Sequence, residues 1–223
     1  MKFDPMTRDF LSGATFSNGH RFSLGNVGRA PRRAERLVEI CRGRNVLHVG
    51  CCDHLDLIRE KIAQGVYLHQ TLCGVASRCV GMDINAAGVA LLRELGFAEV
   101  YVPDAVPDGE HDICLLADVI EHVGDVVAFL RSMRRYRFKE LVVATPNAFR
   151  LRNFFSSGEL VNTDHRYWFT PYTLSKVLVD AGYAPQRMEL CHGDYVSAQG
   201  AFLARVLDCL PKYRDTLIVT AAR

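Results

Sequence analysis

An apolar segment that ends at a glycine, NVLHVGCCDH at positions 45–54, constrains this chain more than any other stretch. Its first half has the character of a buried strand, and the residues after Gly50 indicate a polar turn that leads into a helix. A second apolar run, CVGMDIN at 79–85, ends at Asp83. A carboxylate in this position of a βαβ unit is suited to bind a ribose diol. Together, the two strand ends predict a site for an adenosine-containing cofactor.

Strand and helix signals alternate along the rest of the chain. Proline at position 31 and glycine at position 43 bracket a predicted helix at 31–41. Strands are then expected at 46–50, 78–84, 98–102, 112–117, 140–145, 185–191 and 215–221, and helices at about 54–76, 86–95, 123–136 and 173–182. This order predicts an α/β fold whose mostly parallel sheet is covered by helices on both faces. Ligands of such sheets bind beyond the carboxyl ends of the strands.

The chain length of 223 residues and the apolar content of 49% fit a single domain, expected over 31–223. Residues 1–30 form an N-terminal extension that we expect to be irregular and able to act as a lid. Two connections, 146–171 and 192–214, are longer than usual, and long connections are often functional. The first leaves the carboxyl end of a strand and is rich in polar and aromatic residues. It is therefore the predicted acceptor loop.

Targeting signals and cysteine spacing bear on the compartment and on metals. No stretch is apolar enough to span a bilayer, and the first ten residues lack the apolar centre of a signal peptide, so we expect a cytoplasmic protein. Most of the eight cysteines lie in apolar patterns, which favours buried, reduced thiols. Because no CxxC or His-paired spacing occurs, a structural zinc is not expected.

The net charge is +2, and arginines cluster at 29–44 and again at 131–139. The second cluster continues a helical pattern and has no interleaved aromatic stacking platform. A solvated basic helix face explains it, so neither a nucleic-acid partner nor a membrane partner is expected.

Four polar residues or turns follow successive strands: Gly50 with Cys51, then Asp83, Asp104 and Asp118. This ordered set resembles the class I S-adenosylmethionine-dependent methyltransferases over roughly 45–190. The segments ADVIEHV (117–123) and VVATPN (142–147) are similar to small-molecule O-methyltransferases of the ubiquinone-biosynthesis type. NTDHRYWFTPYTL (162–174) resembles an element of methyltransferases in glycan and natural-product pathways. The resemblance implies a Rossmann-like fold with a seven-stranded, mostly parallel sheet and an antiparallel last strand.

The resemblance also implies S-adenosylmethionine as the cofactor. Gly50 permits close backbone approach, and Asp83 would accept the ribose hydroxyls. The implied cofactor-binding residues are Gly50, Cys51, Asp83, Ile84, Asp104, Ala105, Ala117 and Asp118. Two positions depart from the family pattern, because His48 stands where relatives usually carry an acidic residue and Cys52 where they carry glycine.

Transfer of a methyl group to a hydroxyl needs a group that removes the acceptor's proton, and a neutral imidazole suits that task. His165 in the acceptor loop is our first candidate for this base, and His122 is the second. Asn147, Asp164, Tyr167 and Trp168 are the predicted substrate-binding residues. Asp118, Glu121 and His122 form D-x-x-E-H, a spacing that some quinone O-methyltransferases use for a divalent metal. No fourth ligand is evident, so no metal is expected.

The leading hypothesis is methyl transfer to a hydroxyl of a sugar or another polar small molecule. A catalytically degenerate partner protein is the alternative suggested by His48 and Cys52. An NAD-linked oxidoreductase shares the strand, glycine and carboxylate but would need a full GxGxxG, which GCCDHL lacks. RNA methylation is a third alternative, based on the arginine run. The sequence leaves the oligomeric state open, with a homodimer as one option.

Overall fold

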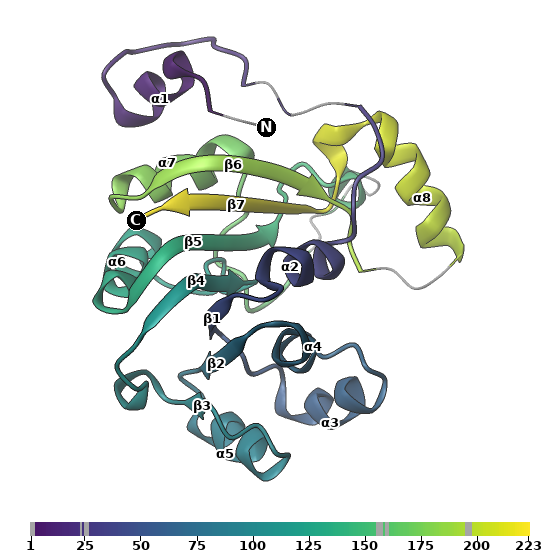
Figure 1. Ribbon diagram of the computed structural model, residues 1–223. Helices are drawn as coiled ribbons and strands as arrows, with labels where there is room; N and C mark the ends of the chain where they lie inside the picture. Colours follow the sequence, from purple (N-terminus) through teal and green to yellow (C-terminus); the bar gives the residue numbers. More distant parts are fainter. Residues whose placement is uncertain (1–2, 23, 25–26, 155–157, 159–160, 195–197) are drawn as a thin grey trace.

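The computed structural model of the chain describes residues 3–22, 24, 27–154, 158, 161–194 and 198–223. A seven-stranded sheet with the order β3-β2-β1-β4-β5-β7-β6 forms its centre (Figure 1). The strands are β1 (Asn45–Val49), β2 (Arg78–Met82), β3 (Val100–Tyr101), β4 (Glu110–Ala117), β5 (Arg137–Pro146), β6 (Ala184–Cys191) and β7 (Thr216–Ala222). Only β7 pairs antiparallel with its neighbours; the other pairs are parallel. The predicted fold class is confirmed.

Alternating side chains of each central strand build two cores, one on each face of the sheet. On one face, Leu47, Cys114 and Leu141 join residues of α6 (Val126–Ser132) and α7 (Pro171–Asp180). On the other face, the neighbouring strand residues pack against α2 (Arg33–Cys41) and α4 (Leu68–Val75). A third core joins α3 (Leu55–Ala63) and α5 (Ala86–Glu94) beside β3. No helix among the described residues is both long and apolar enough to cross a membrane.

Three predicted elements differ from the structure. The helix expected at 54–76 is two helices, α3 and α4, because the chain turns at Gly65 with φ +68°. The helix expected at 123–136 is shorter and ends in a 3-10 turn at Met133–Arg135. The long connection at 192–214 contains α8 (Ala198–Cys209), so it is not simply a loop.

The N-terminal extension contains α1 (Pro5–Ser12), which packs on α7 (Figure 1). Phe3 and Leu11 are buried in the same core as α7, and Lys176 Nζ donates a hydrogen bond of 2.8 Å to the Leu11 carbonyl. None of the described residues before Arg33 lines either of the two site cavities. The described part of the extension is thus a packed element away from the site, and a lid role stays a prediction.

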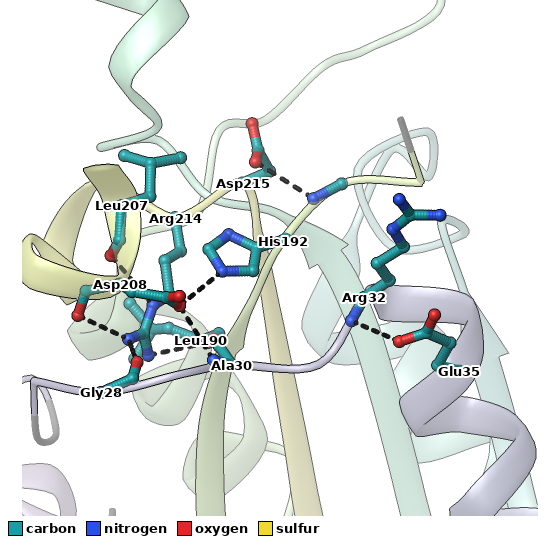
Figure 2. A network of polar contacts seen from close by, with 11 residues as sticks. Gly28, Ala30, Arg32, Glu35, Leu190, His192, Leu207, Asp208, Arg214 and Asp215 are labelled. Atoms are coloured by element: carbon teal, nitrogen blue, oxygen red, sulfur yellow. Dashed lines mark hydrogen bonds and ion pairs between the residues drawn. The ribbon is translucent and has the colours of Figure 1, made fainter. Parts of the chain in front are cut away.

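The segment that leads into α2 is held in place by a buried arginine (Figure 2). The guanidinium of Arg214 donates to the main-chain carbonyls of Gly28, Leu190, Leu207 and Asp208. The Asp208 carboxylate accepts from His192 Nε2 at 2.9 Å and from the Ala30 amide at 3.0 Å. The Arg33 amide donates to the His192 carbonyl at 2.9 Å. These bonds fix the first turn of α2 beside the carboxyl end of β6.

Candidate functional site

A cavity of about 1200 Å³ opens at the carboxyl ends of β1, β2 and β4. This is the point where the strand order reverses, and ligands of open α/β sheets bind there. Six of the eight predicted cofactor residues line it: Gly50, Cys51, Asp83, Ile84, Ala117 and Asp118. The folded chain therefore brings together residues that are up to 68 positions apart in the sequence, from Gly50 to Asp118.

The turn after β1 requires the glycine at its first position. Gly50 has φ +70°, and a Cβ added to it would lie 2.4 Å from Val119 Cγ2. The amides of Gly50 and Cys51 both donate to the Met82 carbonyl, at 2.8 and 3.2 Å. Both the backbone conformation and the close approach to Val119 make any residue with a side chain costly at position 50. The crossover from β1 to α3 is thereby pressed against the end of β4.

Cys52, which stands where relatives carry glycine, does not have a positive φ. Its side chain packs against α5 at Gly88, where an added Cβ would lie 2.8 Å from Cys52 Sγ. The absence of a side chain at Gly88 makes room for the thiol of Cys52. The departure at position 52 is therefore accommodated without strained backbone at that residue.

Asp83 is held rigidly at the end of β2. One carboxylate oxygen accepts from the Cys52 amide at 2.9 Å, and the other accepts from the Asn85 amide at 2.9 Å. Each oxygen has a second lone pair, so both can still accept from a ligand hydroxyl. Ile84 follows with 89% of its surface exposed, which leaves an apolar side chain open beside the carboxylate.

His48 lies at the base of the cavity and is buried. Its Nδ1 is 3.2 Å from His69 Nδ1, and its Nε2 has no partner among the described residues. Burial lowers the pKa of His48 well below its usual value, with further lowering from His69 and Arg33. Position 48 therefore offers a neutral hydrogen-bonding atom to a ligand, where an acidic residue would offer a charge.

Asp104 and Ala105 lie in a 3-10 turn at Pro103–Ala105, outside the residues that line the cavity. The side chain of Asp104 is 94% exposed and pairs with Arg135 at 3.4 Å. The Ala105 amide donates to the Val102 carbonyl at 3.0 Å. Pro103 of the same turn and Arg135 do line the cavity, so the turn adjoins it, and the contact of Asp104 and Ala105 with adenine stays a prediction.

Arg33 is a site residue that the sequence reasoning missed. Its guanidinium forms a close ion pair with Asp118 and a second one, at 3.0 Å, with Asp194. Burial opposes the charge, but attraction to the two carboxylates outweighs it and raises the pKa of Arg33. Asp118 itself has φ +55°, a left-handed conformation that costs energy in a residue other than glycine. The pair connects the first turn of α2 to the end of β4.

A second cavity of about 440 Å³ adjoins the first. Five residues line both: Arg33, His54, Asp118, His122 and Asp164. The second cavity also receives Arg150, Arg152 and His165 from the predicted acceptor loop. Its lining is dense in charged and polar groups, which suits a polar ligand.

Glu121 lies between β4 and the acceptor loop and is completely buried. Thr145 Oγ1 donates to its Oε2 at 3.0 Å, while its Oε1 has no partner among the described residues. Burial, and secondarily the charge of Asp118, raise the pKa of Glu121 to about 8. The carboxyl group is therefore protonated at neutral pH and can donate a hydrogen bond.

The two candidate bases, His122 and His165, lie next to each other with ring centroids 4.8 Å apart. His122 Nδ1 donates to the Asp164 carbonyl at 3.0 Å, which leaves its Nε2 as the acceptor nitrogen. Nδ1 of His165 has no partner among the described residues. Burial, followed by the nearby His122 and Arg150, lowers the pKa of His165, so it is neutral at pH 7.

Glu121, His122 and His165 place their ligand atoms within 4.8 Å of one another, a spacing that could hold a metal ion. This set differs from the D-x-x-E-H spacing in the sequence, because Asp118 is paired with Arg33. The third member comes from the acceptor loop instead, 43 positions after His122 in the sequence.

Of the four predicted substrate-binding residues, Asp164 lines both cavities. Asn147 is fully buried, and its side-chain amide donates to the carbonyls of Lys212 and Arg214 at 2.9 and 2.8 Å. Asn147 therefore has no amide hydrogen left for a substrate, and its role in this structure is to tie the end of β5 to the start of β7. The Tyr167 hydroxyl donates to the Gly124 carbonyl at 2.5 Å, and Trp168 packs between His165 and Arg150. These two rings support the loop from outside the cavities.

No protein-family profile matches the chain. Two proteins of Mycobacterium tuberculosis, MT3114 and Rv3030, are each named "Probable S-adenosylmethionine-dependent methyltransferase" and are 28% identical to this chain over 169 residues. The similarity covers 71% of this chain and 56% of each relative. The chain thus spans little more than half the length of the curated relatives that it matches.

Solved structures of methyltransferases share the fold. An S-adenosylmethionine-dependent methyltransferase from Archaeoglobus fulgidus is 20% identical with a TM-score of 0.53, covering 86% of this chain and 91% of that one. Magnesium protoporphyrin IX methyltransferase of Synechocystis PCC 6803, crystallised with S-adenosylhomocysteine, is 16% identical with a TM-score of 0.53, covering 85% and 81%. The strand order, the antiparallel β7 and these neighbours define the fold as that of the class I S-adenosylmethionine-dependent methyltransferases.

Proposed function

We propose that this chain is an S-adenosylmethionine-dependent methyltransferase that methylates a hydroxyl of a sugar or another polar small molecule. The observation that carries the proposal is the pair of adjoining cavities, which share Arg33, His54, Asp118, His122 and Asp164. The first has the lining of a nucleoside site at the switch point of the sheet. The second is polar and reaches the acceptor loop. A transferase needs this arrangement, because its two substrates must meet at a common wall.

The residues of the first cavity fit the cofactor. Asp83 presents two oxygens with free lone pairs for the ribose hydroxyls, and Ile84 lies open to cover a ring. Gly50 has no side chain, which lets a ligand approach the backbone of the crossover. When bound, S-adenosylmethionine supplies an electrophilic methyl group on a sulfonium. Ala117, the last residue of β4, and Asp118, which follows it, line the wall of the first cavity that faces the sulfonium in this proposal.

Proton removal is assigned to the residues of the second cavity. His165 is neutral at pH 7 and is our first candidate for the base, with His122 beside it as the second. The bond from His122 Nδ1 to the Asp164 carbonyl fixes the orientation of that ring. Glu121, in its protonated form, can donate to an acceptor oxygen and so help to orient the hydroxyl. Alignment of the acceptor oxygen supplies much of the rate in a displacement of this kind.

Calorimetry with S-adenosylhomocysteine and with NAD⁺ tests the cofactor assignment. We expect binding of the first and no heat from the second. Folded protein that binds NAD⁺ and not S-adenosylhomocysteine would favour the oxidoreductase alternative. Protein that binds neither would favour the degenerate partner.

The acceptor class is tested by transfer of a radiolabelled methyl group. Purified protein and labelled S-adenosylmethionine are incubated with panels of sugars, phenols and RNA, and the labelled products are separated. We expect label in polar small molecules. Label only in RNA would overturn the acceptor class while leaving the methyltransferase assignment intact.

A further inference from the structure

A cluster of soft metal-binding side chains lies where α4 meets β2, and one of its members, His69, lines the first cavity. It consists of His69, Cys73 and Cys79, which we name the α4–β2 cluster, and its ligand atoms lie within 4.8 Å of one another. His69 Nε2 is 3.7 Å from Cys73 Sγ, and His69 Nδ1 is 3.8 Å from Cys79 Sγ. Zinc bonds of about 2.0–2.3 Å place tetrahedral ligands roughly 3.5 Å apart. The two sulfur atoms lie near different nitrogens of the His69 ring, so sharing one ion at Nε2 requires the Cys79 side chain to turn towards that nitrogen, within a cluster whose ligand atoms already lie within 4.8 Å of one another.

The backbone presents these ligands in a preorganised way. His69 and Cys73 are four residues apart on α4, so they lie on the same face of that helix. Cys79 comes from β2, which packs against α4. His69 and Cys79 are buried, whereas Cys73 is exposed and leaves a route for the metal from solvent.

The surroundings hold the His69 ring in position. His48 Nδ1 lies 3.2 Å from His69 Nδ1. A histidine that binds zinc through one nitrogen usually donates from the other to a protein acceptor, and His48 supplies that acceptor. Below the ring, a Cβ at Gly81 would lie 2.9 Å from both Cε1 and Nε2 of His69, so only glycine leaves room there.

We propose that the α4–β2 cluster binds one zinc ion through His69 Nε2 and the thiolates of Cys73 and Cys79, with water as the fourth ligand. Two thiolates and an imidazole form a donor set that favours zinc over magnesium or calcium. Both sulfurs bind zinc as thiolates, so any proton that either of them carries before binding is released to solvent. The cluster at Glu121, His122 and His165 has no sulfur ligand and lines the second cavity, so the two sites are chemically distinct.

The test uses the full chain, reduced and stripped of metal with a chelator. Titration with Zn²⁺ measures stoichiometry and affinity, and Co²⁺ reports sulfur ligands through its thiolate charge-transfer absorption. We expect one zinc per chain and a cobalt spectrum typical of tetrahedral sulfur ligation. Cys73→Ser should weaken zinc binding at least tenfold, because one of the three protein ligands is lost. Circular dichroism verifies that this exposed substitution leaves the fold intact.

Two variants serve as controls. Cys209→Ser removes another exposed cysteine, on α8, and should leave zinc binding unchanged. His165→Ala removes a ligand of the cluster formed by Glu121, His122 and His165, and it should also leave zinc binding unchanged. No zinc binding by folded, reduced protein would overturn the proposal. Zinc binding that persists in Cys73→Ser and is lost in His165→Ala would also overturn the proposal, because it would show that the metal binds in the second cavity. Because no cofactor is present, the result does not depend on the proposed function.

Discussion

Replacing Gly50 with alanine tests the crossover between β1 and α3. At φ +70°, an L-residue costs about 1–2 kcal/mol relative to glycine. In addition, the new Cβ would stand 2.4 Å from Val119 Cγ2, which forces a local shift. Overpacking of this kind typically costs about 1–3 kcal/mol. The free energy of unfolding should therefore fall by roughly 2–5 kcal/mol in Gly50→Ala.

Gly43 provides a matched control. It has φ +67°, but a Cβ there would meet nothing within 4 Å. Gly43→Ala therefore carries only the conformational cost of about 1–2 kcal/mol. Urea denaturation of the two variants separates the free-energy cost of the contact with Val119 from the cost of the left-handed backbone conformation. Calorimetry should also show that Gly50→Ala weakens binding of S-adenosylhomocysteine at least tenfold, whereas Gly43→Ala leaves it unchanged.

The double variant Gly50→Ala/Val119→Ala isolates the contact further. Val119→Ala removes the methyl group that the new Cβ would strike, so the two substitutions should be non-additive, with a favourable coupling of about 1–2 kcal/mol. If Gly50→Ala is no more destabilised than Gly43→Ala, or if the coupling is zero, the crossover does not press against β4 as described.

Three further predictions concern the two cavities. Asp83→Ala should raise the dissociation constant of S-adenosylhomocysteine by about a hundredfold or more, since two hydrogen bonds to a carboxylate, each worth about 1.5–3 kcal/mol, are lost; unchanged calorimetric affinity would contradict the ribose assignment. His165→Ala should lower turnover while cofactor affinity stays within about twofold, and unchanged turnover would move the base to His122 or to water. The raised pKa of Glu121 makes wild-type stability fall as pH rises from about 4.5 towards about 8, because ionisation is easier in the unfolded chain. Glu121→Gln should remove this pH dependence. In urea titrations, the unfolding free energy of the variant relative to wild type should therefore increase between about pH 4.5 and pH 8. A difference that does not change with pH would refute the raised pKa of Glu121.

The sequence predicted the sheet and the position of the first cavity because both depend on local patterns. Apolar runs of strand length identify β1, β2 and β4, and the polar residue after each run falls at the same edge of a parallel sheet. Gly50 and Asp83 were therefore predictable as neighbours without knowledge of any side-chain contact. The turn at Gly65 was missed because a glycine within an apolar helical pattern is compatible with either one helix or two.

Contacts between distant segments were not predictable. Arg33 reaches Asp118 only because Arg214 and Asp208 fix the preceding segment from the far end of the chain. Asn147 follows a strand like a site residue does, yet its amide is used to join β5 to β7. Local pattern cannot distinguish a polar group that faces a cavity from one that satisfies buried carbonyls, because both follow strand ends.

The second cavity contains groups that lower the stability of the folded chain, and this observation helps to decide between an active enzyme and a degenerate partner protein. Glu121 is fully buried with a carboxyl oxygen that no described residue contacts by a hydrogen bond, and Asp118 holds a left-handed backbone conformation. Each feature lowers the stability of the folded chain, by on the order of 1–3 kcal/mol. His122 and His165 lie beside Glu121, and Nδ1 of His165 has no hydrogen-bond partner among the described residues. Strained and unsatisfied polar groups concentrated at one place are typical of catalytic sites, where they serve the reaction. A partner protein that only presents a surface would gain nothing from them, so their presence favours an active enzyme over a degenerate one.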